Sequence, residues 1–159
     1  MHYDVIVTAE IKQDVFKPAN DMPAERLLST IFGSNTKIVS EGTLSSGKDG
    51  RITLKFQSTN NRDNEISFSK SEPELISFRR GETSFQDPVT VFLEEGKRHR
   101  CISKGQGGER VEFTTRTDLL ENRLLKSGKM ILEYSIEVCG VQVEHTNIKL
   151  SVVHDKSKE

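Results

Sequence analysis

The residues of this chain with the most distinctive chemistry are Arg98 and Arg100, because strand alternation places both on an apolar face. A turn at Glu95-Gly96 and a second turn at 105–108 predict three antiparallel strands that share one inward register. The apolar residues of that register are Val91, Leu93, Ile102, Val111 and Phe113. A buried cation must meet a carboxylate, a carbonyl, water or an anionic ligand. The pattern therefore predicts an interior site in which a guanidinium binds a carboxylate or phosphate head.

Tyr134 and His145 are expected to line the same interior, because a two-residue turn at Cys139-Gly140 pairs them across neighbouring strands. They would add a hydroxyl and a titratable donor to the ligand site. The alternative is an internal ion pair, in which Glu82 is the inward carboxylate that meets the arginines. Arg80 and Glu82 continue the inward face of the strand that precedes them.

Three other motifs carry weaker chemistry. Cys101 and His99 lie two residues apart, but the register places their face outside the barrel, without a wall that excludes water. The glycine-rich stretch 105–108 leads into a strand, so we expect a turn rather than a phosphate-binding loop. The histidines show no ligand spacing with each other or with cysteine. We therefore expect a protein that is not an enzyme and has no metal site and no cofactor.

Composition favours a single soluble domain in the cytoplasm. The chain has 159 residues, of which 33% are hydrophobic and 30% are charged. A net charge of −1 disfavours binding to nucleic acid, and alternation splits the basic run 97–100 between two strand faces. Two distant cysteines form no disulfide framework, which suits a reducing compartment. The alternating, partly acidic N-terminus is expected to be neither a signal peptide nor a membrane span.

Period-two alternation dominates the chain and predicts an all-β fold. Besides the strands above, it indicates a strand at the N-terminus, a pair joined at 47–50, and a pair around Glu72-Pro73. A bulge or short helical turn is expected between Asp118 and Lys126, and another bulge near Asn147, where the inward parity changes. These elements predict a closed antiparallel β-barrel of about eight to ten strands with one short helix.

The short helix is expected over residues 21–32, with Asp21 as its N-cap and Gly33 as its C-terminal stop. Its apolar stripe would either close one end of the barrel or serve as a lid or a docking helix. We expect one domain over residues 1–153, followed by a charged tail over 154–159.

Three stretches of the chain resemble the YwiB-like bacterial proteins, a family of unknown function. They are FRRGE at 78–82, VFLEEGKRH at 91–99 and SGKMILEYSIEVCGVQVEHTNIKLSV at 127–152. The resemblance spans roughly residues 36 to 153, and it implies a calycin-type barrel similar to lipocalins and fatty-acid-binding proteins. The last hairpin departs from the family pattern, since Cys139-Gly140 stands where an Asn-Gly-like pair is usual. The resemblance supports the fold and implies no activity.

The sequence thus predicts a binding protein of the cytoplasm that holds a small anionic or amphipathic molecule inside a β-barrel. The ligand would lie near Arg98, Arg100, Tyr134 and His145. The alternative is a structural or interaction module with a filled barrel, whose inward arginines form an internal ion-pair network.

Overall fold

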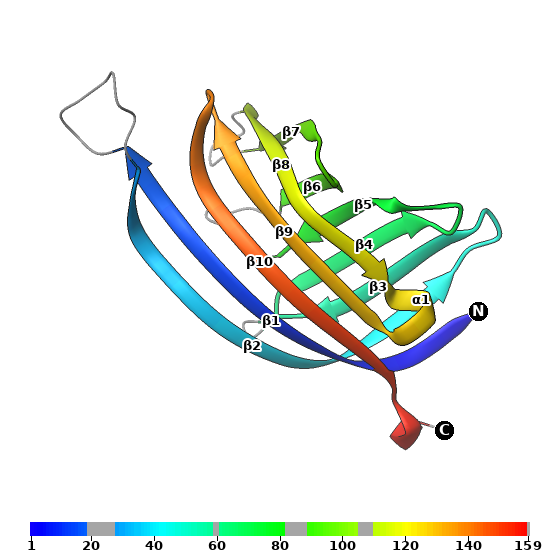
Figure 1. Ribbon diagram of the computed structural model, residues 1–159. Helices are drawn as coiled ribbons and strands as arrows, with labels where there is room; N and C mark the ends of the chain where they lie inside the picture. Colours follow the sequence, from blue (N-terminus) through cyan, green and yellow to red (C-terminus); the bar gives the residue numbers. More distant parts are fainter. Residues whose placement is uncertain (19–27, 59–60, 82–88, 105–109, 159) are drawn as a thin grey trace.

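The fold is all-β, as predicted, and consists of one curved antiparallel sheet (Figure 1). It was analysed as a computed structural model that describes residues 1–18, 28–58, 61–81, 89–104 and 110–158. Ten strands lie within these residues: β1 His2–Pro18, β2 Leu28–Ser46, β3 Arg51–Gln57, β4 Asp63–Ser69, β5 Glu72–Arg80, β6 Val89–Glu94, β7 Arg98–Lys104, β8 Arg110–Arg123, β9 Lys129–Val138 and β10 Val141–His154. A single turn of helix, α1 (Leu124–Ser127), joins β8 to β9.

The sheet curls back on itself to form a nearly closed barrel. Its strand order is β6-β5-β4-β3-β2-β1-β10-β9-β8-β7, so β6 and β7 are the two ends of the hydrogen-bonded sheet. Figure 1 shows the long strands β8, β9 and β10 crossing in front of the shorter strands β3 to β5, with β1 and β2 running along the lower left. The strands alternate between an apolar inner face and a polar outer face, which is the pattern that the sequence predicts.

Two threonine side chains of β8 join the ends of the sheet. The hydroxyl of Thr115 donates to the carbonyl of Phe92, at 2.7 Å, and the hydroxyl of Thr117 accepts from the amide of Glu94, at 3.1 Å. Both threonines are buried and point inward from β8 toward the backbone of β6. Thr117 also exchanges backbone hydrogen bonds with Gly96 and Lys97, so the barrel is closed at this seam by a few side-chain and backbone bonds rather than by the continuous ladder of a fully closed barrel.

The inner face of the sheet holds one hydrophobic core. Every strand except β7 and β8 supplies large aliphatic or aromatic residues at alternate positions, and β8 adds Phe113 and Leu120. The largest fully buried side chains are Tyr134, Phe68, Leu54, Ile66, Ile76, Leu93, Met130, Leu132, Ile136 and Ile148. Burial of these apolar surfaces is the main stabilising contribution to such a domain.

The predicted helix over 21–32 is wrong where the structure describes it. Residues 28–32 belong to β2 and pair with the end of β1, from Phe32 opposite Val15 to Leu28 opposite Pro18. The remaining residues of the predicted helix lie outside the described residues. A helix of this length is marginal in water, whereas the end of β1 offers residues 28–32 backbone partners along one edge.

The irregularity predicted between Asp118 and Lys126 is confirmed in both its forms. The ladder between β8 and β9 shifts register at Asp118, and α1 follows a few residues later. The turn at Cys139-Gly140 is also confirmed, because both residues adopt a left-handed conformation, with φ of 51° and 77°. No helix among the described residues is long and apolar enough to cross a membrane.

The first residues of the C-terminal tail, His154 and Asp155, pack against the barrel. His154 is the last residue of β10, and the Asp155 amide donates to the carbonyl of Asp4 at 2.9 Å. Asp155 is buried, and Lys156–Lys158 form a single 3-10 turn. Of the expected charged tail, at least its first two residues therefore belong to the folded domain.

Candidate functional site

A cluster of polar side chains lies inside the barrel and is the candidate functional site. Arg80 donates from Nη1 to the Glu144 carboxylate at 2.8 Å and to the Tyr134 hydroxyl at 2.9 Å. Thr146 donates to the same carboxylate oxygen at 3.2 Å, and Gln13 donates to the other oxygen of Glu144. We call these five residues the interior polar cluster. It contains one cation and one anion, so its formal charge is balanced.

Four strands position this cluster: β5 supplies Arg80, β9 supplies Tyr134, β10 supplies Glu144 and Thr146, and β1 supplies Gln13. Arg80 ends the inward series of β5, two residues after Phe78. Tyr134 belongs to the inward series of β9, and it pairs directly with Thr146 of β10. Glu144 faces inward because the ladder between β9 and β10 shifts register between Gln142 and Glu144.

Burial and charge set the protonation of the cluster. Burial alone lowers the pKa of Arg80, but electrostatic interactions and hydrogen bonds with Tyr134 and Glu144 outweigh it, so the pKa of Arg80 is raised. Burial also raises the pKa of Tyr134 to about 12, with Arg80 opposing the shift and Glu144 adding to it. Arg80 is therefore a permanent cation at neutral pH, and Tyr134 is a neutral phenol that accepts its hydrogen bond.

The guanidinium of Arg80 has donors that the protein leaves unused. It carries five N–H groups, and both of its hydrogen bonds leave from Nη1. Within the described part of the chain, no hydrogen bond leaves from Nε or Nη2. The side chain as a whole is only 6% exposed, but no buried side-chain nitrogen among the described residues lacks a partner, so the unbonded nitrogens of Arg80 keep some contact with solvent. An acceptor that reached them would find them already oriented by the two bonds of Nη1.

The inward placement of Arg98 and Arg100 is wrong. Their side chains are 61% and 79% exposed, and each pairs with a carboxylate on the outer surface. Arg98 bonds Glu137 at 3.0 Å, and Arg100 bonds Glu112 at 2.9 Å. Exposed ion pairs of this kind contribute at most about 1 kcal/mol to stability, and neither of these two arginines is available to an interior ligand.

A register error of one residue explains the wrong placement. The sequence pairs Arg100 with Phe113, whereas in the structure Cys101 is opposite Phe113 and Arg100 is opposite Thr114. The last pair of this ladder is Lys104 with Arg110, which leaves five residues between the strands instead of the four expected. Because side chains alternate, one extra residue exchanges the two faces of β7.

Cys101 is accordingly inside the barrel and not on its surface. The side chain is 2% exposed, and its thiol lies 3.8 Å from the carbonyl oxygen of His99. Burial raises the pKa of the Cys101 thiol. The His99 ring bonds Glu94 at 3.2 Å, and the contact of the thiol with His99 is to its backbone carbonyl and not to its ring. The pair has neither the thiolate nor the base that a nucleophilic site needs.

His145 also lies on the face opposite to the one predicted. Its ring is on the outer surface, where it contacts Glu133 at 3.2 Å, while its neighbour Glu144 faces the interior. The predicted bulge near Asn147 exists, but it occurs four residues earlier, at Val143. The parity of Ile148 signals a bulge in this strand, yet the sequence pattern does not fix its position. Glu144 was missed for this reason.

The other two predicted site residues have separate outcomes. Tyr134 lies inside the barrel, fully buried, as the alternation indicates. Glu82 lies outside the described residues. The inward direction of β5 up to Arg80 is as the sequence predicts, so the interior cation comes from β5 instead of β7.

Comparison with known proteins relates this chain to one described fold. No family model matches it, and no curated protein matches it. Among solved structures, it is similar to the ywiB protein from Bacillus subtilis, with a TM-score of 0.59 over 94% of this chain and 92% of that chain. The sequence identity is 9%, so the match shows a shared fold. The resemblance to YwiB-like proteins is confirmed at this level.

Proposed function

We propose that this protein binds a small amphipathic molecule inside the barrel, with an acceptor or singly charged anionic head group against Arg80 and Tyr134. The observation that carries the proposal is the guanidinium of Arg80, whose side chain is only 6% exposed and bonds the protein through Nη1 alone, so that its other N–H groups remain available to a ligand. A ligand oxygen that accepted from these N–H groups would replace their contact with solvent by a charge-assisted hydrogen bond in a mostly buried environment.

The charge balance of the interior limits the head group. Glu144 already neutralises Arg80, so each further negative charge would lie in an interior with no free cation among the described residues. A carboxylate, a carbonyl or a hydroxyl fits this environment better than a doubly charged phosphate. Next to Arg80 on the inner face are Phe78 on the same strand and Val89 on the paired strand, which would contact the apolar part of the ligand.

The proposal describes a binding protein of the cytoplasm and not an enzyme. Two observations support this. Cys101, which is the cysteine near His99, is buried, and the pKa of its thiol is raised, which disfavours a nucleophilic thiolate. Arg80 and Glu144 bond each other, so neither is a free acid or base. Both cysteines are free thiols, which agrees with a reducing compartment.

A filled barrel is the second candidate, and a specific observation favours it. Among the described residues, no buried side-chain nitrogen or oxygen atom lacks a hydrogen-bond partner. Both carboxylate oxygens of Glu144 are also bonded. In this case the interior polar cluster is structural, and the protein acts through its outer surface.

Two measurements distinguish the candidates. The first is native mass spectrometry of the freshly purified protein, before and after organic extraction. The second is a fluorescence titration of the extracted protein with 1-anilinonaphthalene-8-sulfonate, an amphipathic probe with one negative charge. Both are made on the parent, on Arg80→Met/Glu144→Leu, and on Arg100→Met. The double variant removes the cation and anion together, so no unpaired charge is left inside. Arg100→Met removes the same charge from the outer surface.

Interior binding predicts an extra mass that extraction removes, and probe binding that is at least about tenfold weaker in the double variant and unchanged in Arg100→Met. A bare mass together with equal probe affinity in all three proteins would refute interior binding and leave the filled barrel.

A further inference from the structure

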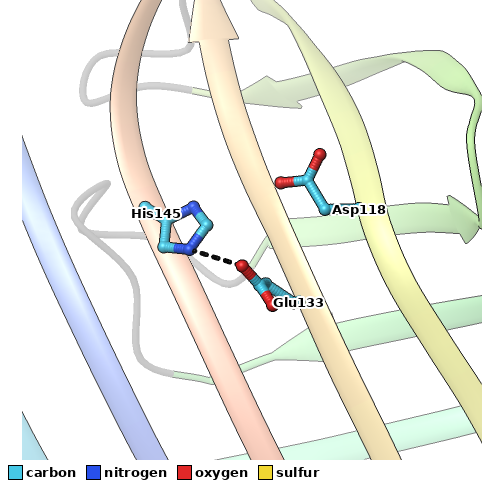
Figure 2. Close-up of side chains that lie close together, drawn as sticks. All are labelled: Asp118, Glu133 and His145. Atoms are coloured by element: carbon cyan, nitrogen blue, oxygen red, sulfur yellow. Dashed lines mark ion pairs between the residues drawn. The ribbon is translucent and has the colours of Figure 1, made fainter.

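Three potential metal ligands gather on the outer face of β8, β9 and β10. Figure 2 shows Asp118, Glu133 and His145 on three neighbouring strands, with their side chains directed toward one another. Each offers one ligand atom, and these atoms lie within 4.8 Å of one another. The Nε2 atom of His145 is 3.2 Å from a carboxylate oxygen of Glu133. All three side chains are partly exposed, so an ion can reach them from solvent.

We propose that Asp118, Glu133 and His145 form a binding site for a divalent transition-metal ion of the zinc class. One imidazole nitrogen and two carboxylate oxygens are a ligand set that such ions accept, whereas calcium and magnesium prefer oxygen alone. Two ligands at about 2.1 Å from a tetrahedral ion are about 3.4 Å apart, close to the His145–Glu133 separation. Three protein ligands leave at least one coordination position open to water. The proposal is independent of ligand binding inside the barrel.

The surroundings orient the imidazole for this role. The Nδ1 atom of His145 lies 3.0 Å from the hydroxyl oxygen of Ser135, which is fully buried and is also bonded by Gln142 at 3.1 Å. Metal-binding histidines commonly hold their second ring nitrogen to an oxygen, which fixes the ring and leaves the other nitrogen for the ion. Ser135 is thus a positioning residue that directs Nε2 toward Glu133.

Two bulges bring the ligands to one face. Asp118 is the residue at which the ladder between β8 and β9 shifts, and it has no partner on β9. Val143 is the corresponding extra residue on β10, and it turns His145 outward. Bulges redirect side chains in this way and are frequent beside binding sites. Without the second bulge, His145 would face the interior and the imidazole would be missing from the cluster.

One neighbouring cation modulates the site. Arg116 bonds a carboxylate oxygen of Asp118 at 3.2 Å, so the carboxylate must serve the ion with its remaining lone pairs. The two carboxylates and Arg116 give the empty cluster a formal charge of −1, which attracts a divalent cation less strongly than −2 would. We therefore expect a micromolar rather than a nanomolar site.

The test is a calorimetric titration of the full chain with ZnCl2 after treatment with a chelator. It is carried out in a Cys139→Ser background, because Cys139 is an exposed thiol that could bind zinc on its own. The variants are His145→Gln, Glu133→Gln and the control His99→Gln. The control is matched, because His99 also bonds a glutamate at 3.2 Å, but within the described residues no third ligand group joins that pair.

We expect one equivalent of Zn²⁺ to bind with a Kd below about 100 µM, and His145→Gln and Glu133→Gln to weaken binding at least about tenfold. His99→Gln should bind as the parent does. A second readout is the visible spectrum with Co²⁺, which should show d–d bands that His145→Gln abolishes. The proposal is overturned if the parent binds no Zn²⁺ in this range, or if His145→Gln binds as tightly as His99→Gln.

Discussion

The interior ion pair between Arg80 and Glu144 predicts a strong asymmetry between single and double substitutions. The pair is buried, with Nη1 of Arg80 2.8 Å from the carboxylate. Arg80→Met leaves the carboxylate without its cation, and Glu144→Leu leaves the guanidinium without its anion. Removing one partner of a buried pair costs about 3–5 kcal/mol, because the remaining charge stays desolvated. In a chain of this size, that loss lowers Tm by about 6–20 °C.

The double variant Arg80→Met/Glu144→Leu should be far more stable than the sum of the single effects indicates. It replaces both charges by apolar groups of similar volume, and such exchanges cost less than about 2 kcal/mol or are stabilising. The residual cost comes from the hydroxyls of Tyr134 and Thr146 and the amide of Gln13, which each lose a hydrogen-bond partner.

Urea unfolding of the four proteins, followed by circular dichroism and by fluorescence, measures these free energies. The matched control is Arg100→Met/Glu112→Leu, which removes an ion pair from the outer surface and should change stability by less than about 1 kcal/mol in the singles and in the double. Strict additivity of the Arg80 and Glu144 substitutions, or single effects below about 1 kcal/mol, would refute the buried pair.

Three further outcomes follow from other parts of the barrel. Folding raises the pKa of Tyr134 from 10.0 to about 12, so the unfolded chain loses this proton first as pH rises. The free energy of unfolding should therefore fall by about 3 kcal/mol between these two pH values. Denaturation curves of Tyr134→Phe should lack this pH dependence. Gly128→Ala should lower the free energy of unfolding by more than about 2 kcal/mol, since its Cβ would lie 2.4 Å from a carbonyl oxygen. The control Gly50→Ala has a similar φ but no atom within 4 Å of its Cβ, so it should lose less in the same assay. Thr115→Val leaves the carbonyl of Phe92 without its donor, so it should lower the free energy of unfolding by about 1–3 kcal/mol and accelerate amide exchange in β6. Unchanged amide exchange would contradict the conclusion that this threonine helps to close the barrel.

Most of the fold could be predicted from period-two alternation, because a half-buried strand shows its inner face directly. The alternation in Ile66, Phe68, Ile76 and Phe78 gives the correct inner face on β4 and β5, and it carries Arg80 inward with them. The turn at Cys139-Gly140 has a two-residue length that fixes the first pairs of its hairpin. In these places the local pattern is sufficient.

The closure of the barrel could not be predicted in the same way. A tight turn at Glu95-Gly96 normally joins two strands that pair with each other, and the Lys97 amide does donate to the carbonyl of Glu94 across it. The chain then leaves β6 and pairs with β8, whose threonine side chains satisfy the exposed backbone of β6. This choice depends on the curvature of the whole sheet, which no local pattern contains.

The candidate sites depend on single-residue events that the sequence pattern cannot locate. The bulge at Val143 directs Glu144 inward and His145 outward, so one inserted residue decides both the partner of Arg80 and the ligand beside Glu133. With a regular hairpin in the predicted register, His145 would face Arg80, and two donors would meet inside the barrel without a carboxylate. The buried cation would then be unpaired, at a cost of several kcal/mol. The need to neutralise the charge of Arg80 with Glu144 therefore favours a bulge at Val143. Because side chains alternate along β10, the imidazole of His145 then faces outward. The interior polar cluster and the outer cluster of Asp118, Glu133 and His145 are in this sense two faces of one register.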